Sequence, residues 1–309
     1  MKPKIAITAG DPFGIGPEII VKALKDPRLQ NLFIPIIIGE KTSLLDSGFM
    51  PDMGTLINTA ADRECDRPAE RAPSAYGGEI SCRAVALGVK LALEKEVNAL
   101  VTAPVSKESW ALGSVKFTGH TDFLKEAARV QNVLMMFTAG KINAGLVTEH
   151  QAIADLSKEI TVKKIIHAGQ LLNKAMLDKK IKNPRIAVAA VNPHAGDGGK
   201  LGGEENKIII PAIKTLQKEN INIEGPFPID SLWAKHAKGM FDAILCMYHD
   251  QALIGLKLAA KEPAVHITCG LPFLRTSPAH GTAFDIAGQN RADPEGMVAA
   301  LLYAVKNYF

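Results

Sequence analysis

The segment KIAITAGDPFGIGPEII, residues 4–20, opens the chain with a short strand-like run, a glycine-rich turn and an apolar helical pattern. Pro17 suits the first helical turn, because its missing N–H would be unpaired there in any case. The spacing G-x-x-x-G-x-G of Gly10, Gly14 and Gly16 is not the G-x-G-x-x-G of a Rossmann turn, and no acidic residue ends a second strand at the expected distance. We therefore expect a tight strand-to-helix turn lining a ligand cleft, and not a Rossmann fold.

The alternation of strand-like and helix-like runs continues along the chain. NALVTA precedes SKESWAL, RIAVAAV precedes EENKIIIPAIKTLQK, and DAILCMY precedes DQALIGLKL. This order is typical of βαβ units and a largely parallel sheet. The 309 residues exceed the roughly 250 beyond which one core tends to split. The sequence therefore predicts an α/β protein with two α/β/α lobes and a cleft between them.

Two segments allow more local predictions. Apolar residues recur at helical spacing from Thr161 to Met176, which predicts a helix with one buried stripe. The segment from Pro51 to Ser74 is rich in Asp, Arg and Pro and favours an irregular connection. Asp230, in FPIDSLW, precedes an expected helix and is a candidate N-cap that could also touch a ligand.

Composition limits the class of partner and the compartment. The net charge of +4 is small and the lysines are scattered, so we expect no nucleic-acid partner. The apolar run LFIPIIIG is far shorter than the roughly 20 residues that span a bilayer, and the N-terminus has no signal-peptide pattern. No paired C-x-x-C spacing links Cys65, Cys82, Cys246 and Cys269, and the last two lie in apolar runs that favour buried free thiols. We expect a cytoplasmic enzyme without a membrane partner.

Three histidines follow strand-like runs at equivalent positions. His150 comes after INAGLVT, His194 after RIAVAAV and His249 after DAILCMY. The carboxyl ends of parallel strands open onto one edge of a sheet, where ligands bind, so the three imidazoles could converge. Glu149 and Asp250 flank two of the rings and could orient them. A three-histidine site leaves coordination positions open, which is the pattern of a catalytic metal.

A second cluster of polar residues lies in HITCGLPFLRTSPAHGTAFDIAG, residues 266–288. Its Arg275, together with Lys257 and the pair His120 and Thr121 in FTGHTDF, provides donors suited to a phosphate or a carboxylate.

Seven segments in order over nearly the whole chain resemble the PdxA family, the 4-hydroxythreonine-4-phosphate dehydrogenases of pyridoxal phosphate biosynthesis. They are GDPFGIGPE, TAPVSK, FTGHTDF, NPHAGDGG, YHDQAL, GLPFLRTS and HGTAFDIAG. The resemblance implies oxidation of 4-phosphohydroxy-L-threonine at C3 by NAD, dependent on a divalent metal, followed by decarboxylation to 3-amino-2-oxopropyl phosphate. In that reaction the metal would bind the C3 hydroxyl and lower its pKa.

The first and last of these segments also resemble isocitrate and isopropylmalate dehydrogenases, which bind NAD without a Rossmann fold. That resemblance implies that the C-terminal segment holds the adenosine side of NAD and that the opening loop lies near the nicotinamide. It implies a cofactor-binding lobe of residues 1–127 with 263–309, and a metal-binding and dimerisation lobe of residues 128–262. The implied cofactor residues are His280, Gly281, Thr282, Ala283 and Asp285.

The resemblance also assigns the remaining site residues. The metal ligands are His150, His194 and His249, which with Lys257 form the catalytic set. The metal would be Zn, Co or Mg, and the cofactor NAD or NADP. Family structures imply a homodimer with a shared active site, in which His249 serves the partner subunit. The substrate-binding residues are His120, Thr121, Lys257, His266 and Arg275.

Two departures from the family pattern bear on the substrate. His266 stands where the family usually has asparagine, and Ala279 stands where an aspartate usually precedes H-G-T. An imidazole loses the paired donor and acceptor of an amide, and alanine loses a charge near His280. Dehydrogenation of 4-phospho-D-threonate, of 4-phospho-D-erythronate or of an aromatic cis-dihydrodiol dicarboxylate is therefore an alternative. A metal-dependent binding protein for phosphorylated acids is a further one, from a non-catalytic class.

Overall fold

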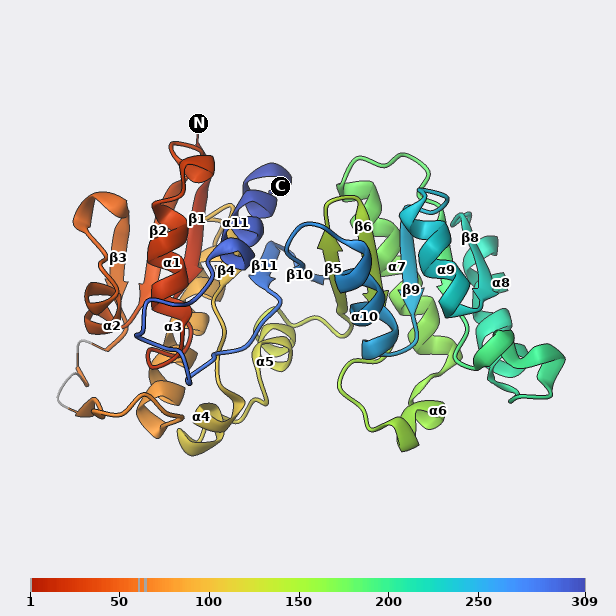
Figure 1. Cartoon of the computed structure of the whole chain (residues 1–309), viewed down its shortest axis with the longest axis horizontal. Coiled ribbons are helices and arrows are strands. Elements are labelled where there is room, and N and C mark those ends of the chain that lie inside the picture. Colours follow the sequence, from red (N-terminus) through yellow and green to blue (C-terminus); the bar gives the residue numbers. More distant parts are fainter. Residues whose placement is uncertain (1, 61, 64–65, 309) are drawn as a thin grey trace. The chain divides into compact units, whose positions relative to one another are not determined.

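The computed structural model describes residues 2–60, 62–63 and 66–308 and shows the expected mixed α/β architecture. The chain forms two compact units (Figure 1): unit 1 is Met1–Gln131 with Leu271–Phe309, and unit 2 is Asn132–Gly270. The first boundary lies after residue 131 and not 127, and the second after residue 270 and not 262, so that His266 belongs to unit 2 and not to the expected cofactor lobe. The functional roles assigned to the lobes stay predictions.

The sheet of unit 1 is parallel and begins with the opening strand. Its strands lie in the order β3-β2-β1-β4-β11, and each neighbouring pair is parallel. The apolar side chains of β1, β4 and β11 are buried, as a parallel sheet covered by helices requires, whereas β3 at the edge is half-buried and Ile34 at the start of β2 is exposed. The bounds are β1 Lys4–Thr8, β2 Ile34–Gly39, β3 Thr55–Asn58, β4 Ala99–Thr102 and β11 Leu274–Pro278.

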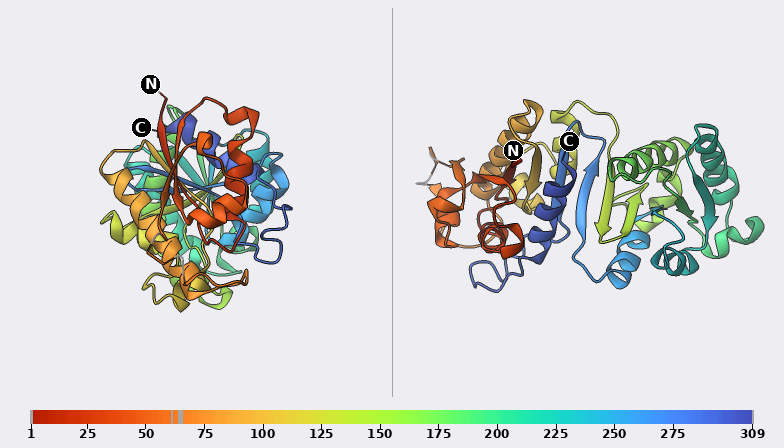
Figure 2. Two further views of the ribbon diagram at one scale, coloured as in Figure 1. Left: turned by 90° about the vertical axis from the view of Figure 1, so that its left-hand side faces the viewer. Right: turned by 90° about the horizontal axis from the view of Figure 1, so that it is seen from above.

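Helices cover both faces of this sheet. Helix α1 (Gly16–Leu24) contacts α11 (Glu295–Asn307), which packs on β4 and β11. Helix α3 (Ala75–Leu93) packs on β1, β2 and β4 and contacts α4 and α5. Figure 2 shows the orange and red end of the chain with helices on either side of the strands. The remaining elements are α2 Lys41–Asp46, α4 Lys107–Leu112, α5 His120–Ala127, and the short 3₁₀ turns η1 Pro27–Leu29 and η2 Pro51–Met53.

The sheet of unit 2 combines an antiparallel and a parallel part. Strand β5 is antiparallel to β10 and β6, whereas β6, β9, β7 and β8 follow one another in parallel. Because β6, β9 and β7 are parallel, their carboxyl ends share one edge. The bounds are β5 Leu134–Ala139, β6 Ile142–Leu146, β7 Ile186–Ala189, β8 Ile223–Phe227, β9 Ala243–Cys246 and β10 Val265–Cys269.

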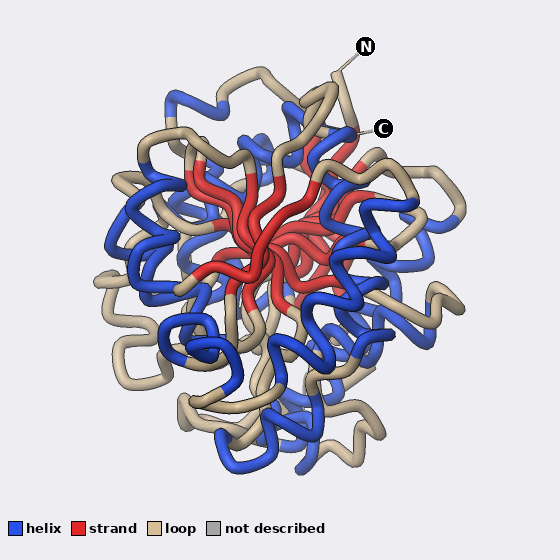
Figure 3. The backbone as a smooth tube through the Cα atoms, turned by 90° about the vertical axis from the view of Figure 1, so that its right-hand side faces the viewer, coloured by secondary structure: helices blue, strands red, loops and turns tan. Residues whose placement is uncertain are grey.

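Helices lie on both faces of unit 2 as well. Helix α7 (Val162–Asp178) packs on β5, β6 and β9, and α8 (Ile210–Lys218) packs against it. Helices α9 (Ile229–Ala237) and α10 (His249–Ala259) contact each other, and α10 packs on β5, β6 and β9. Figure 2 (right) shows α7 in green and α10 in blue on opposite sides of the strands, and Figure 3 shows strands in red flanked by helices. Other elements are η4 Ile153–Asp155, α6 Leu156–Glu159, η5 Pro193–Gly199 and the π-helix η6 Glu205–Ile209.

Local predictions are partly confirmed. Helix α7 begins after Thr161, whose side chain accepts a hydrogen bond from the N–H of Lys164. The predicted irregular connection from Pro51 to Ser74 is wrong in part, because Thr55–Asn58 pairs with β2 as strand β3. The N-cap of α9 is Pro228, so the capping role predicted for Asp230 is wrong; Asp230 lies in the first turn.

The thiols behave as buried groups. Cys246 and Cys269 are buried and free, as predicted, and burial raises the pKa of both thiols. Cys82 is free and half-buried, and Cys65 lies outside the described residues.

His236 is held in unit 2 as a neutral side chain. Its Nε2 accepts a hydrogen bond from the N–H of Asn143 (3.2 Å), so Nδ1 carries the proton and donates to the carbonyl of Phe241 (3.0 Å). Burial lowers the pKa of His236 below its ordinary value of 6.5, and the opposing effects of Phe241 and Asp242 are smaller. A proton on Nε2 would face the Asn143 N–H and break that bond.

Acidification should therefore destabilise unit 2 through His236. The unfolded histidine takes up a proton near pH 6.5 and the folded one at lower pH, so the contribution to the free energy of unfolding is lost as pH falls below about 6.5. Urea unfolding followed by the fluorescence of Trp233, whose ring centroid lies 5.9 Å from that of His236, should show this in a Trp110→Phe background. His236→Gln should have a flatter profile between pH 7.5 and 5; an equal slope would contradict the assignment.

Candidate functional site

The loops that carry the three histidines leave adjacent strands of unit 2. Loops follow β6 toward His150, β9 toward His249 and β7 toward His194. The first two are joined beyond their strands: the N–H of Val147 donates to the Cys246 carbonyl (2.9 Å), and the Thr148 hydroxyl donates to the Met247 carbonyl (2.7 Å). The pairing of β6 with β9 is thus extended toward the histidines.

The structure brings His150 and His249 together. Their ring centroids lie 5.5 Å apart. Nδ1 of His249 lies 2.7 Å from a carboxylate oxygen of Asp250, which can only accept, so Nδ1 carries the proton of the neutral ring. Nε2 of His249 then has a free lone pair, which is the form of imidazole that binds a metal.

His194 lies on the third loop and is exposed. Residues 194–198 of η5 all have positive φ, including 52° at His194, 52° at Ala195 and 42° at Asp197, a costly conformation for residues with a side chain. Buried Glu205 fixes the start of this loop, since its Oε1 accepts from the N–H groups of Val191 (3.0 Å) and Asn192 (2.8 Å). Within the described ranges, no group of three His, Cys, Asp or Glu side chains is arranged to hold a metal. The structure therefore joins two of the three predicted ligands, and the role of His194 stays a prediction.

The predicted anion-binding residues divide between the two units. In unit 1, Arg275 of β11 is fully buried and its Nη2 donates to the Thr102 hydroxyl (2.6 Å). Burial lowers the pKa of the Arg275 guanidinium to about 9, because the buried charge loses its hydration. Burial, and to a smaller extent the charge of Arg275, lowers the pKa of His120 well below 6.5. His120 is therefore neutral at pH 7 and begins helix α5, with Thr121 next to it.

The other predicted substrate residues belong to unit 2. Lys257 lies on α10 and is exposed. His266 of β10 is paired in register with Phe137 of β5, and their rings stack with centroids 5.1 Å apart. Whether these residues share one substrate with His120, Thr121 and Arg275 stays a prediction.

The opening loop contacts the predicted cofactor segment within unit 1. The N–H of Ile15 donates to the Thr282 carbonyl (2.9 Å), and a Cβ on Gly14 would lie 2.9 Å from that same oxygen. Gly14 therefore permits the close approach of two segments far apart in the sequence. His280, Gly281 and Asp285 of this segment are exposed, and Ala283 has φ of 43°.

Two buried carboxylates that the sequence did not single out hold these loops. Asp11 accepts from the Ser109 hydroxyl (2.6 Å) and the Phe13 N–H (3.0 Å), and burial raises its pKa despite these bonds. Glu18 of α1 accepts from the N–H of Ala292 (2.8 Å), just beyond the cofactor segment. The sequence carries no signal for the contacts with Ser109 and Ala292, because these partners are remote in the chain.

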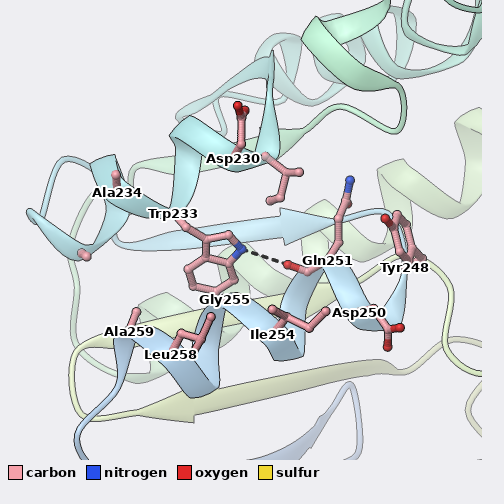
Figure 4. Close-up of a pocket in the computed structure, with 12 residues that line it drawn as sticks. Asp230, Trp233, Ala234, Tyr248, Asp250, Gln251, Ile254, Gly255, Leu258 and Ala259 are labelled. Carbon is pink, nitrogen blue, oxygen red and sulfur yellow. Dashed lines mark hydrogen bonds between the residues drawn. The ribbon is translucent and has the colours of Figure 1, made fainter.

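A pocket between α9 and α10 was not predicted either. Figure 4 shows it along α10 from Asp250 to Ala259, with Trp233 donating from Nε1 to the Gln251 carbonyl (2.9 Å). Its walls are mainly apolar, and its polar lining includes Asp230, Tyr248 and Asp250. Asp250 follows His249, so this pocket begins next to the histidine pair.

Comparison with known proteins identifies the family. The model of the family described as pyridoxal phosphate biosynthetic protein PdxA matches residues 54–304. A 4-hydroxythreonine-4-phosphate dehydrogenase of Geobacter metallireducens is 36% identical, over 99% of this chain and 95% of that protein. The chain belongs to the PdxA family. A protein of Oceanobacillus iheyensis, provisionally named D-threonate 4-phosphate dehydrogenase, is 37% identical over 99% of this chain and 98% of its own.

Solved structures agree with this assignment. The 4-hydroxythreonine-4-phosphate dehydrogenase of Klebsiella pneumoniae has a TM-score of 0.87 at 33% identity, covering 99% of this chain and 98% of its own. A terephthalate 1,2-cis-dihydrodiol dehydrogenase of Burkholderia xenovorans LB400 has a TM-score of 0.69 at 24% identity, covering 99% and 98%, and shares the fold. The predicted PdxA membership is confirmed and makes the chain an oxidoreductase, which implies a nicotinamide cofactor. No helix of the described residues is long and apolar enough to cross a membrane.

Proposed function

We propose that this PdxA protein oxidises 4-phosphohydroxy-L-threonine at C3 with NAD and a divalent metal, and that decarboxylation then yields 3-amino-2-oxopropyl phosphate for pyridoxal phosphate biosynthesis. The observation that carries the proposal is the pairing of His150 and His249 at the ends of β6 and β9 in a chain of this family. The names of the relatives from Geobacter and Klebsiella support the substrate.

The histidine pair fits a divalent metal. The Asp250 carboxylate fixes the proton of His249 on Nδ1, and Nε2 keeps its lone pair beside the ring of His150. His194, on the neighbouring loop, would complete the set. Imidazole donors favour Zn or Co, whereas Mg prefers oxygen ligands. When bound, the metal lowers the pKa of a contacted hydroxyl and the nicotinamide accepts a hydride.

The chain's own residues would bind and orient the substrate. The buried guanidinium of Arg275 and the first turn of α5, with His120 and Thr121, form a cationic, donor-rich place for the phosphate. Neutral His120 acts there as a hydrogen-bonding group without a charge of its own. Lys257 and His266 would contact the rest of the substrate, and binding the remote phosphate would orient C3.

The function is tested by stripping and restoring divalent metal and following NADH formation with three phosphorylated acids. We expect metal-dependent NADH from 4-phosphohydroxy-L-threonine and little from 4-phospho-D-threonate or 4-phospho-D-erythronate. Turnover of 4-phospho-D-threonate instead would favour the activity in the name of the Oceanobacillus relative. No turnover of any of the three would contradict the proposal and favour the cis-dihydrodiol substrate or a non-catalytic binding protein.

A histidine variant provides the control for this assay. His194→Ala should abolish activity with little loss of helical circular dichroism, because the exposed ring supports no described core contact. An active variant that retains metal would remove His194 from the proposed ligands.

Cofactor binding by residues His280 to Asp285 can be tested at Gly281. A Cβ added at Gly281 meets nothing within 4 Å, so Gly281→Ala should leave the thermal midpoint unchanged. If the adenosine lies against this segment, the added methyl should weaken NADH binding about tenfold, roughly 1.4 kcal/mol. Fluorescence titration with NADH measures this, and unchanged affinity would argue against contact at Gly281.

The protein is also proposed to act as a homodimer. Helix α10, which begins at His249, exposes Ile254 (60%) and Leu258 (83%), two large apolar side chains one turn apart. Within one chain His249 lies beside His150. That His249 serves the active site of the partner subunit stays a prediction.

Light scattering of Leu258→Glu tests the dimer. A buried charge at the interface should convert the dimer to a monomer at micromolar concentration. Leu112→Glu, at a similarly apolar exposed position in unit 1 (54% exposed), should leave the mass unchanged. A dimeric Leu258→Glu would place the interface elsewhere.

A further inference from the structure

The buried amide of Gln251 joins two of the histidine-bearing loops. Gln251 lies in the first turn of α10, two residues after His249, and is 6% exposed. We infer that Gln251 is a positioning residue that holds the His194 and His249 loops in register with each other. The inference rests on the proposed metal site, and it deepens that proposal by naming the group that preorganises the site.

Each end of the amide contacts a different loop. Oε1 accepts from the N–H of Met247, just after β9, at 2.8 Å. Nε2 donates to the carbonyl of Ala190, just after β7, at 2.5 Å. A glutamine at this helical position commonly reaches back to the helix start. In this chain its other end also crosses to the neighbouring strand.

The chemistry of these contacts requires an amide. The Met247 N–H needs an acceptor and the Ala190 carbonyl needs a donor, so only one orientation of the amide satisfies both. A carboxylate would keep the first bond and place a charged acceptor against the Ala190 carbonyl. A leucine would fill similar volume and leave both buried backbone groups without this partner.

Met247 extends the link to the third loop. Its carbonyl accepts from the Thr148 hydroxyl on the way to His150, while its N–H donates to Gln251. The backbone of Gln251 is itself fixed, because its carbonyl accepts from Trp233 of α9 (Figure 4). Gly255, one turn later, makes room for that indole, since a Cβ there would lie 2.1 Å from Trp233.

Such a link matters most for the conformation of the His194 loop. This loop contains six consecutive residues with positive φ, 194–199. Glu205 binds the backbone before them at Val191 and Asn192, and Ala190 lies at the start of the same loop. A metal site gains affinity when its ligand loops need no reordering on binding. Groups behind the ligands typically change metal affinity by about 10–100-fold when removed.

Amide hydrogen exchange of the metal-free protein tests the coupling directly. In Gln251→Leu the Met247 amide should exchange at least tenfold faster, and so should those of Val191 and Asn192, whose partner Glu205 is intact. Gln251→Glu should restore protection at Met247 only. The matched control is Gln217→Leu, which removes a similar bond from Nε2 to the Ile223 carbonyl (2.8 Å) of the same unit and should change none of the three. Unchanged exchange at Val191 and Asn192 would overturn the coupling.

Metal affinity is measured on the same proteins by competition of Zn²⁺ or Co²⁺ with a chelator. We expect the dissociation constant to rise 10–100-fold in Gln251→Leu and not in Gln217→Leu. Wild-type affinity in a folded Gln251→Leu overturns the inference alone. If wild type binds metal no better than His249→Ala, the proposed metal site is wrong, and so is a positioning role toward it.

Discussion

The parallel pairing of β6, β9 and β7 is the constraint on which the histidine site depends. Side chains that follow three parallel strands emerge at one edge of the sheet, and backbone hydrogen bonds continue past the strands at Val147 and Thr148. The pairing of β7 with β9 ends at Val188 and Leu245. Beyond that point the buried amide of Gln251 connects the two strands through hydrogen bonds to Met247 and Ala190. The paired strands and a few buried polar groups thus fix the positions of the histidine-bearing loops.

Unit 1 differs in that it holds ionisable side chains buried away from water. Arg275 and His120 are close enough for the guanidinium to lower the imidazole pKa, and burial lowers the pKa of both. The Asp11 carboxylate is buried under the opening loop with two hydrogen bonds. Desolvated groups of this kind interact more strongly with an ionic ligand than exposed ones do.

Much of the fold and part of the site could be predicted, for identifiable reasons. The strands that precede His150, His194 and His249 are short β-branched or apolar runs, and helix α7 has a clear apolar period and a threonine cap. Strand β3 was missed because its four residues lie among polar and proline-rich neighbours, and pairing with β2 decides it. The cap of α9 was misassigned because backbone geometry places Pro228, and not Asp230, at the boundary.

The sequence by itself determined the α/β class, the PdxA family, the strand-end histidines and the non-Rossmann character of the opening loop, because these follow from local patterns and motif spacing. Only the tertiary structure decided which of those residues meet. It joined His150 to His249, stacked His266 on Phe137, set Thr282 against the opening loop, and gave Gln251 its two partners. Such contacts depend on register and on buried hydrogen bonds between remote segments, which composition and periodicity do not encode.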